Sequence, residues 1–457
     1  MSAIAHSPRA RDTYPTTIGS VHASRQTIAR IGEPGLETLW TRTARLEVTS
    51  DPNLPEKVDV AVVGGGFTGM TAARELLNAG LSVAVLEAGK IGNGASGMNA
   101  GFVVPNFARA DVAGVRAKLG QERGNALLRL VGDGANAVFR TIEEDGIDCD
   151  ARQTGWLNPA YGNAAAEMLK ARAAQWRELG RPVSFLDAAE VRAQTGMSIY
   201  SGALLDQEGG TIHPLDYLRG LAHGVQRRGG TVHEHHCVER VSSEHGNWRL
   251  VMRSGGSISA RKVLVCTNAF TTGVASRMGR SAVPLKVYQI ATTSADPSTV
   301  RRIAPDGRPV GDTRQNLFTY RLDRDNRLIS GGMAAVPLGA FTRLGRSVAT
   351  RLGEELDLPD AVSPEIVWSG TAAMTPDFLP RLYRFGDGWF GGIGCNGRGI
   401  AMTAQLGRVL ARAALGESID ELPIPVRPLR PLPFHRFTPL VASAALLQAR
   451  LKDRFVQ

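Results

Sequence analysis

The first strongly patterned stretch of the chain covers residues 58–87. Val58–Val63 is a β-branched apolar run, which predicts a buried strand. Thr68–Ala79 combines small and apolar residues in a pattern typical of a helix, and Gly80 closes it. A second apolar run ends at Glu87. The expected order is therefore strand, helix, strand.

Later stretches alternate between helical and strand periodicity. Apolar residues spaced three to four positions apart, and alternating apolar positions, predict the remaining elements. The predicted helices are Gly124–Glu144 and Asn163–Leu179 in an inserted region at about 115–195, Pro214–Arg228, and Ala401–Leu415. The predicted strands are Thr231–Val241, a hairpin at 248–253 and 258–266, and an antiparallel sheet at 284–333. This sheet would form a second domain.

Three glycines join the first strand to the first helix with the spacing Gly64-x-Gly66-x-x-Gly69. Gly64 allows a tight turn, Gly66 leaves room for a pyrophosphate, and Gly69 lets the helix lie close to the strand. The phosphates would then lie at the N-terminus of the helix that begins at Thr68, where free amide groups and the helix dipole favour negative charge. This combination predicts a dinucleotide-binding unit.

Glu87, at the end of the second strand, indicates which dinucleotide binds. Its carboxylate would accept hydrogen bonds from a ribose 2′-hydroxyl and would repel a 2′-phosphate, so the adenosine half is of the NAD or FAD kind. A glycine-rich segment at 92–101 follows and suits contact with a cofactor. A second glycine-rich stretch at 388–400 precedes the last long helix and offers another site for negative charge. One dinucleotide with two such sites points to FAD.

Composition narrows the function classes only slightly. A chain of 457 residues with 43% hydrophobic and 21% charged residues is ordinary for a globular protein, with about two or three compact units. The net charge of +10 comes mostly from scattered arginines, without a basic block, so no nucleic-acid partner is expected. The segment 1–55 is polar and irregular, and it would pack on the body around Leu36–Trp40.

The cysteines and histidines indicate no metal site. The four cysteines lie far apart and suggest a reducing compartment; they are Cys149, Cys237, Cys266 and Cys395. His233 and His235 alternate along a predicted strand, which favours a solvated strand over metal ligands. The N-terminal stretch has no apolar leader, and no apolar run reaches 18 residues. These features predict a cytoplasmic protein without a transmembrane segment.

With these motifs in this order, the chain resembles the D-amino-acid oxidase-like (DAO) family of FAD-dependent oxidoreductases, most of all its γ-glutamylputrescine oxidase branch. The motifs that carry the resemblance are DVAVVGGGFTGM (59–70), VLEAGKIGNGASGMNAG (85–101), GGTIHPLDY (209–217), KVLVCTNAF (262–270), TPDFLPRL (375–382) and GCNGRGIAMTAQLG (394–407). Together they extend over nearly the whole chain.

The resemblance implies a mixed α/β fold, in which a Rossmann-like FAD-binding domain, split in sequence, carries an inserted antiparallel β-sheet substrate domain. The expected FAD-binding domain comprises 56–112, 200–280 and 365–435, and the cover domain comprises 113–199 and 281–364. Residues 1–55 would form an N-terminal arm. The apolar residues of 436–457 predict a C-terminal helix docked on the body.

The resemblance also implies the residues that bind FAD. Glu87 would bind the adenosine ribose, Val238 would meet the adenine, and Gly394–Ile400 would lie beside the isoalloxazine. The expected cofactor-binding residues are Gly64, Gly66, Phe67, Thr68, Gly69, Glu87, Ala88, Gly94, Ala95, Ser96, Asn99, Ala100, Gly101, Val238, Thr267, Asn268, Gly394, Asn396, Gly397, Arg398, Gly399 and Ile400.

Departures from the relatives refine this picture. The cysteine that attaches flavin in some relatives would fall near Gly370, and no attaching histidine lies in Ala95–Asn99, so FAD is expected to bind non-covalently. The lysine that promotes reaction with oxygen in sarcosine oxidases would fall near Ile329. The electron acceptor therefore stays open between O2 and another acceptor. Arg398 stands where many relatives have histidine.

The implied reaction is oxidation of the C–N bond of a primary or secondary amine or amino acid derivative. Hydride would pass to flavin N5, and the imine would then hydrolyse. Candidates for the substrate wall are Tyr288, Gln289, Tyr320 and Arg321, with Arg314 or Arg321 as a clamp for a carboxylate. The sequence identifies no catalytic acid or base, and it does not indicate an oligomeric state.

Three alternatives stay open at this point. The chain could be a dehydrogenase module that passes electrons to a quinone or a partner subunit, which its apolar C-terminal segment would favour. It could be a flavin-dependent tRNA-modifying enzyme, since relatives of this fold act on modified uridines and the net charge is basic. It could also be a non-catalytic flavoprotein with an interaction role.

Overall fold

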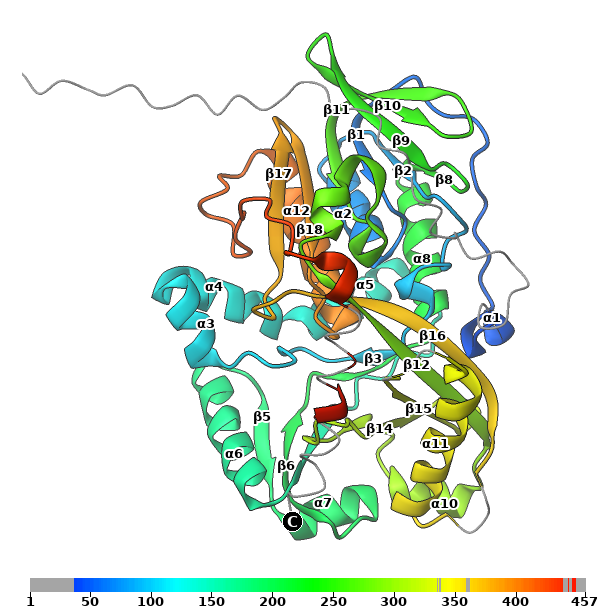
Figure 1. The fold of residues 1–457 in the computed structure, drawn as a ribbon, viewed down its shortest axis with the longest axis vertical. Coiled ribbons are helices and arrows are strands. Elements are labelled where there is room, and N and C mark those ends of the chain that lie inside the picture. The colour runs from blue at the N-terminus through cyan, green and yellow to red at the C-terminus, as the bar shows by residue number, and fades with distance from the viewer. Residues whose placement is uncertain are drawn as a thin grey trace, which may run out of the picture.

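A computed structural model describes residues 37–438 apart from Ala335, Pro337 and 359–361, together with Ser443 and 446–448. Most of the predicted N-terminal arm and C-terminal helix lies outside the described residues. The described chain folds around two large sheets, which lie in the upper and lower halves of Figure 1. The mixed α/β class that the sequence predicts is confirmed.

The first sheet is mainly parallel. Its strand order is β17-β18-β11-β1-β2-β8, where β18, β11, β1, β2 and β8 run parallel and β17 antiparallel. The bounds are β1 (Lys57–Val63), β2 (Val83–Leu86), β8 (Thr231–His233), β11 (Ser257–Val265), β17 (Arg381–Gly386) and β18 (Trp389–Ile393). A meander of β9 (Val238–Glu244) and β10 (Asn247–Met252) extends from β11.

Helices cover one face of this sheet. Those that build the main core with it are α2 (Phe67–Asn78), α5 (Gly134–Asp145), α8 (Pro214–Arg227) and α12 (Gly399–Leu415), with α3 (Val112–Leu119) and α4 (Gln121–Gly132) alongside. The apolar runs of β1 and β2 are buried, as the sequence predicts for strands covered on both faces. The other face carries α9 (Ser276–Gly279) and the meander.

A buried ion cluster ties three of these helices together. The guanidinium of Arg74 on α2 donates from Nε to Asp145 Oδ2 at 2.8 Å, and Arg228, which follows α8, donates from Nη2 to Asp145 Oδ1 at 2.6 Å. The Asp145 side chain is 1% exposed. Burial opposes ionisation of this carboxyl, but the hydrogen bonds from both arginines outweigh it and hold the pKa of Asp145 below its ordinary value. The charged form therefore stabilises the fold.

The second sheet is mostly antiparallel. Its strand order is β16-β12-β15-β14-β13-β4-β6-β5, and only β13 and β4 pair in parallel. The bounds are β4 (Trp156–Tyr161), β5 (Val183–Leu186), β6 (Tyr200–Asp206), β12 (Val283–Ser294), β13 (Val310–Gly311), β14 (Thr319–Leu322), β15 (Arg327–Gly332) and β16 (Pro364–Met374). The helices against it are α6 (Asn163–Glu178), α7 (Ala188–Thr195), α10 (Pro297–Ile303) and α11 (Ala340–Glu355).

The remaining elements are short. These are α1 (Leu39–Thr43), the ribbon of β3 (Phe102–Val103) and β7 (Gly210–Thr211), and the 3-10 turns η1 (Ala95–Gly97), η2 (Asn268–Phe270), η3 (Gly273–Ala275) and η4 (His435–Phe437). Figure 1 shows β3 running between the sheets. No helix in the described part of the chain is long and apolar enough to cross a membrane.

The two faces of the second sheet have different neighbours. Trp368 on β16 packs with Leu39 and Trp40 and with the segment that contains Met98, so this face is directed toward the first sheet. Tyr288 on β12 packs against Ala340 and Leu344 of α11, so the other face is covered by that helix. Gln289 lies directly opposite Trp368 in the register and shares its face. The successive residues Tyr288 and Gln289 of β12 therefore face opposite sides of the second sheet.

Several local predictions need correction. The predicted helix Gly124–Glu144 is two helices, α4 and α5, which meet at Asp133. The predicted strand Thr231–Val241 is interrupted by a turn in which His235 has φ +61°. His233 is fully buried and its Nδ1 lies 2.9 Å from the Asp51 carbonyl oxygen, so it does not belong to a solvated strand. Hydrophobic periodicity does not reveal the break between α4 and α5 or the turn at His235, because the apolar pattern continues across both.

The two sheets also differ from the expected domain boundaries. Strand β6 starts at Tyr200 and β16 extends to Met374, and both belong to the second sheet, although the predicted FAD-binding segments begin at 200 and 365. Helix α5 contacts α12 under the first sheet, although it falls within the predicted cover segment. The division into domains therefore stays a prediction.

Candidate active site

Four of the predicted cofactor segments lie at one edge of the first sheet. Strands β1, β2, β11 and β18 are parallel, so their carboxyl ends meet at the same edge. Gly64, Glu87 and Gly394 directly follow three of these ends, and Thr267 comes two residues after the end of β11. A Cβ on Gly64 would lie 3.0 Å from the Cys266 carbonyl, which shows how closely the first and third of these loops approach. Ligands of open α/β sheets bind at this kind of edge.

The turn after β1 has the geometry of a phosphate-binding loop. Gly64 has φ +106°, and a Cβ on Gly69 would lie only 2.0 Å from the Gly64 carbonyl oxygen. Helix α2 starts after Gly66 without a side-chain cap from that residue. The Ser96 Oγ accepts a hydrogen bond from the Phe67 amide at 3.0 Å. Glycine is required where backbone and helix approach this closely, and the helix N-terminus faces the loop.

Glu87 is held by the backbone on both sides. Its Oε2 accepts from the Gly65 amide at 2.8 Å, and its Oε1 accepts from the Gly89 amide at 2.9 Å. Each carboxylate oxygen keeps a second lone pair, which can accept from a ribose diol. Val238 is partly buried and packs on the same core cluster as Leu86, next to Glu87 in the chain.

The segment 94–101 is fixed by its own side chains and by its neighbours. Asn99 donates from Nδ2 to the Ser96 carbonyl at 2.8 Å and accepts at Oδ1 from the Gly101 amide at 2.8 Å. Two indoles hold it from outside: Trp40 donates to the Asn99 carbonyl at 2.6 Å, and Trp368 donates to the Met98 carbonyl at 3.1 Å. The segment is therefore rigidly placed between α1 and the second sheet.

The loop from Gly394 to Ile400 is shaped by a buried asparagine. Asn396 has φ +49°, accepts at Oδ1 from the Thr375 amide at 2.8 Å, and donates from Nδ2 to the Gly394 carbonyl at 3.0 Å. Arg398 is the N-cap residue of α12, and its side chain accepts no hydrogen bond from the first amides of this helix. Asn268 donates to Cys395 Sγ at 3.7 Å and joins the loops after β11 and β18.

Arg398 points from this loop toward the second sheet. Its Nε donates to Asn106 Oδ1 at 2.9 Å, and its guanidinium lies 5.4 Å from the centre of the Trp156 ring on β4. Burial, together with the nearby positive charge of Arg172, lowers the pKa of Arg398 to about 10. The guanidinium therefore remains charged at neutral pH.

The predicted substrate residues divide between the two faces of the second sheet. Gln289 shares the face of Trp368 and stays a predicted substrate-wall residue. Arg321 shares the face of Ile329, but its Nη1 donates to the Gly101 carbonyl at 2.9 Å and to the Ile212 carbonyl at 2.8 Å. This arginine therefore anchors the segment 94–101, and burial lowers its pKa to about 10.

Three other predicted substrate residues lie on the α11 face, which corrects the prediction for them. Tyr288 packs against α11, and the Tyr320 hydroxyl donates to the Ile303 carbonyl at 2.8 Å inside a hydrophobic cluster. Arg314 is paired with the buried Asp312 and donates from Nη1 to Glu355 Oε1 at 2.9 Å. The structure places none of the three on the face toward the cofactor loops: the pleat turns Tyr288 and Tyr320 away, and Arg314 lies in the loop after β13, where its partner Glu355 belongs to α11.

The indoles of Trp40 and Trp368 are site residues that the sequence reasoning missed. Both are nearly fully buried. For Trp40, the sequence predicts only that Leu36–Trp40 packs on the body, and it does not identify the residue that Trp40 contacts. Trp368 lies in the long strand β16, where an apolar aromatic residue is typical of any core.

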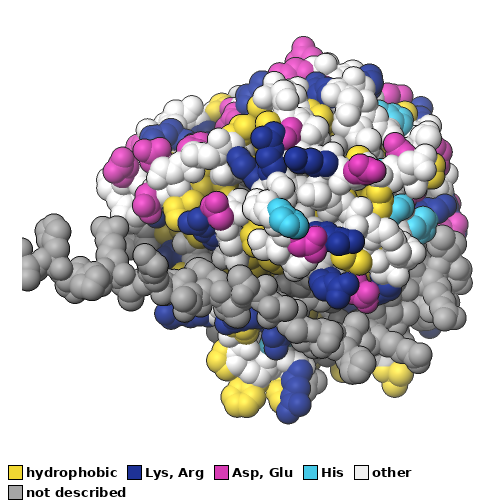
Figure 2. All heavy atoms as spheres, turned by 90° about the horizontal axis from the view of Figure 1, so that it is seen from above, with side chains coloured by type: hydrophobic (Ala, Val, Ile, Leu, Met, Phe, Trp, Pro, Cys, Tyr) yellow, Lys and Arg dark blue, Asp and Glu magenta, His cyan; other side chains and the backbone are white. Residues whose placement is uncertain are grey.

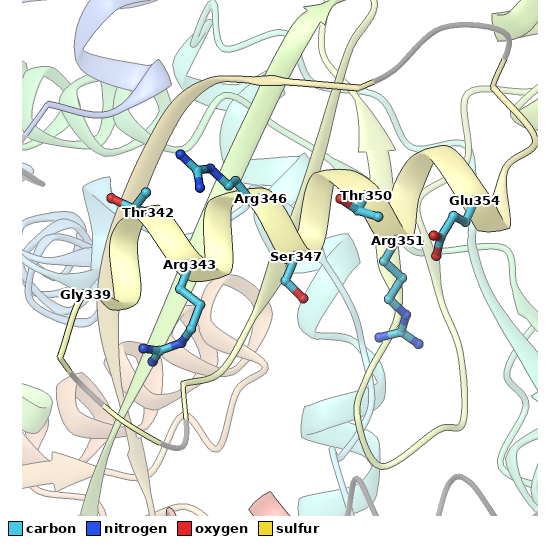
Figure 3. Close-up of a pocket in the computed structure, with 8 residues that line it drawn as sticks. All are labelled: Gly339, Thr342, Arg343, Arg346, Ser347, Thr350, Arg351 and Glu354. Atoms are coloured by element: carbon cyan, nitrogen blue, oxygen red, sulfur yellow. The ribbon is translucent and has the colours of Figure 1, made fainter.

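A surface hollow lies elsewhere, along the outer side of α11. Figure 3 shows Arg343, Ser347 and Arg351 extending from the same side of this helix. The full lining is Gly339, Thr342, Arg343, Arg346, Ser347, Thr350, Arg351 and Glu354. Because α11 covers the sheet face that is turned away from the cofactor loops, this hollow is separate from the candidate active site.

Charge is mixed on the surface near the first sheet. Figure 2 shows Lys and Arg side chains lying among Asp and Glu on the face seen from above. The described part of this face therefore presents no broad field of one sign, although the chain has a net charge of +10.

A parallel sheet with a glycine-rich βαβ turn, a carboxylate directly after its second strand and a second glycine-rich helix start, covered by a mostly antiparallel sheet, defines an FAD-dependent enzyme. Residues 59–413 match the family of FAD dependent oxidoreductases called DAO. The chain belongs to this family, and FAD is its cofactor. The predicted resemblance is thereby confirmed.

Three known proteins show the extent of the similarity. The chain is 30% identical to the γ-glutamylputrescine oxidoreductase of Escherichia coli strain K12 over 362 residues, which cover 79% of this chain and 84% of the relative. A glycine oxidase structure from Geobacillus kaustophilus matches with a TM-score of 0.66 and 22% identity, over 80% and 96% of the two chains. An L-amino acid deaminase from Proteus vulgaris, with its specific insertion deleted, matches with a TM-score of 0.67 and 19% identity, over 82% and 94%.

Proposed function

We propose that the protein oxidises the C–N bond of a primary or secondary amine or amino acid derivative, with FAD bound at the carboxyl edge of the first sheet. One observation carries the proposal: the loops after four parallel strands converge at this edge, beneath a face of the second sheet that is fixed to the segment 94–101. The reaction class is supported by the similarity to the γ-glutamylputrescine oxidoreductase.

The chain's own residues would bind and orient the cofactor. The pyrophosphate would lie at the turn Gly64–Gly69, where the missing Cβ atoms leave space and the N-terminus of α2 supplies positive potential. The ribose would meet Glu87, and the amides before α12 would stabilise negative charge on the isoalloxazine. When bound, FAD supplies a two-electron acceptor for the substrate's hydride.

Non-covalent attachment of FAD belongs to the same proposal. A Cβ on Gly370 would lie 3.2 Å from the Met98 carbonyl oxygen, so the strand packs closely on the cofactor segment at this point and carries no nucleophile there. Acid precipitation of the holoprotein is expected to release the yellow flavin into the supernatant. Flavin that stays with the pellet after washing would contradict non-covalent binding.

The residues around the site would exclude water and leave the electron acceptor open. Trp40 and Trp368 close the site on one side, and the fully buried Ile329 gives the same face an apolar surface. Residue 329, near which sarcosine oxidases have the lysine that promotes reaction with O2, is an isoleucine in this chain and carries no positive charge. O2, a quinone and a partner subunit are the acceptors to compare.

The decisive experiment follows the visible spectrum of the purified holoprotein under anaerobic conditions. Primary amines, secondary amines and amino acids are added one at a time, and we expect one compound class to bleach the flavin. Admission of air, or of a soluble quinone, then identifies the acceptor. A flavin that dithionite bleaches but no amine does would contradict the proposed reaction.

A further inference from the structure

Arg398 differs from Arg314 and Arg321 because no group in the described residues neutralises its charge. Its Nε donates to Asn106, but in the described residues its two terminal nitrogens have no hydrogen-bond partner and no carboxylate lies within 4.0 Å. Those nitrogens are also not sealed from solvent, since they are absent from the buried unpaired atoms. By contrast, Arg314 has two carboxylate partners and Arg321 has backbone carbonyls.

A second cation reinforces this position. Arg172 on α6 lies close enough to lower the pKa of Arg398, and its own Nε is buried without a hydrogen-bond partner. Asp111 is the acidic group that acts on Arg172, but its carboxylate already accepts from the Gly114 amide as the cap of α3. No acidic residue acts noticeably on Arg398 itself. The pair therefore keeps a net positive charge.

The surroundings fit a planar anion. Asn106 accepts from Nε and Trp156 lies 5.4 Å from the guanidinium, so these two contacts orient the planar fork of terminal nitrogens. Two parallel hydrogen bonds from such a fork match the two oxygens of a carboxylate. Partly buried charge without a counterion is unfavourable, so an anion from outside would stabilise the site.

We propose that Arg398, supported by Arg172, binds a carboxylate of the substrate, which makes the substrate an amine that also carries a carboxylate. The proposal rests on the proposed function, because Arg398 belongs to the loop that would lie beside the isoalloxazine. It replaces Arg314 and Arg321 as the clamp, since the fold already occupies both of those side chains.

The first test measures binding without turnover. Acetate and benzoate, which cannot be oxidised as amines, are titrated into the holoenzyme at constant ionic strength, and the shift of the flavin spectrum gives a Kd. Arg398→Gln is expected to raise this Kd about tenfold to a hundredfold, since it removes two hydrogen bonds to a charged group. Arg398→Lys keeps the charge without the fork and is expected to fall between. Arg172→Gln should weaken binding less than Arg398→Gln.

A matched control separates this effect from net charge. Arg346→Gln removes one positive charge from the outer side of α11 and should leave the Kd unchanged. Equal Kd values for wild type, Arg398→Gln and Arg346→Gln would overturn the proposal, as would a wild-type spectrum that responds to chloride as strongly as to benzoate. If Arg398→Gln fails to retain FAD, an unchanged Kd in the Arg398→Lys and Arg172→Gln holoenzymes would overturn it instead.

The second test distinguishes this proposal from the proposed function. Anaerobic flavin reduction is compared for pairs of amines with and without a carboxylate, such as γ-aminobutyrate with butylamine and glycine with methylamine. Wild type should prefer the carboxylate-bearing member through KM, and Arg398→Gln should lose that preference. Equal reduction by both members overturns the carboxylate site and leaves amine oxidation intact. Carboxylate binding without reduction by any amine overturns the proposed function and leaves the anion site intact.

Discussion

Substitution of Gly69 by alanine is the sharpest test of the phosphate-binding turn. The new Cβ would lie 2.0 Å from the Gly64 carbonyl oxygen and 3.1 Å from Val62 Cγ1. Contacts of a real Cβ below 3.0 Å essentially do not occur, so helix and turn must separate by about 1 Å. Neither neighbour can move without a large cost in free energy, because the Gly64 carbonyl belongs to the backbone and Val62 is a buried strand residue.

The magnitude follows from what the displacement disrupts. Overpacking of this kind costs about 1–3 kcal/mol of folding stability. A shift of about 1 Å also misaligns the amides that would donate to the pyrophosphate, and each hydrogen bond to a charged group contributes about 1.5–3 kcal/mol. Loss of one or two such bonds should raise the Kd for FAD by a factor of about ten to ten thousand.

The assay is titration of apoprotein with FAD, followed by flavin fluorescence, with urea unfolding of the same samples. Gly80→Ala is the matched control, since Gly80 also has a positive φ of +80° but no atom within 4 Å of the added Cβ. It should lose stability and keep its FAD affinity. Gly66→Ala should fall between, because its Cβ would lie 2.9 Å from the end of the Ser96 side chain. A Gly69→Ala protein that binds FAD within about threefold of wild type would refute the reasoning.

Three further predictions test other parts of the structure. Glu87→Gln should raise the Kd for FAD about tenfold and leave that for FMN, which lacks the adenosine ribose, unchanged in fluorescence titrations. Asp145→Ala should cost about 3–5 kcal/mol of unfolding free energy in urea at neutral pH, because two buried guanidinium groups lose their partner. Since the pKa of Asp145 is lowered in the folded state, this stability is present above the ordinary pKa of 3.8, and the difference from wild type should vanish as the pH falls through the folded pKa. Burial raises the pKa of the Cys149 and Cys266 thiols, so peptide mass spectrometry should find neither alkylated in the native protein at mildly alkaline pH, and both after denaturation.

The cofactor edge could be predicted because each of its parts is local in sequence. The turn at Gly64–Gly69 is set by glycines whose conformations and contacts leave no alternative, and Glu87 follows from the end of the next strand. The parallel direction of the strands then brings the loop at Gly394 to the same edge. None of this depends on how the second sheet pairs.

The substrate side could not be predicted in the same way, because it depends on register. Tyr288 and Gln289 are neighbours in sequence, yet only the pairing of β12 with β16 shows which of them faces the cofactor loops. Arg314 finds its partner Glu355 41 residues away, and Trp40 meets Asn99 59 residues away. Periodicity carries no information about contacts across such distances.

The arginines of the second half of the chain show what this means for function. Sequence alone gives Arg314, Arg321 and Arg398 the same capacity to bind a carboxylate. The fold separates them by supplying different partners: carboxylates to Arg314, backbone carbonyls to Arg321, and a single amide oxygen to Arg398. An arginine whose donors are already occupied can bind a substrate only by giving up a bond that holds the fold together. Arg398 keeps two donors available beside the cofactor loop, and for this reason it is the one whose replacement should change substrate preference while leaving the two sheets in place.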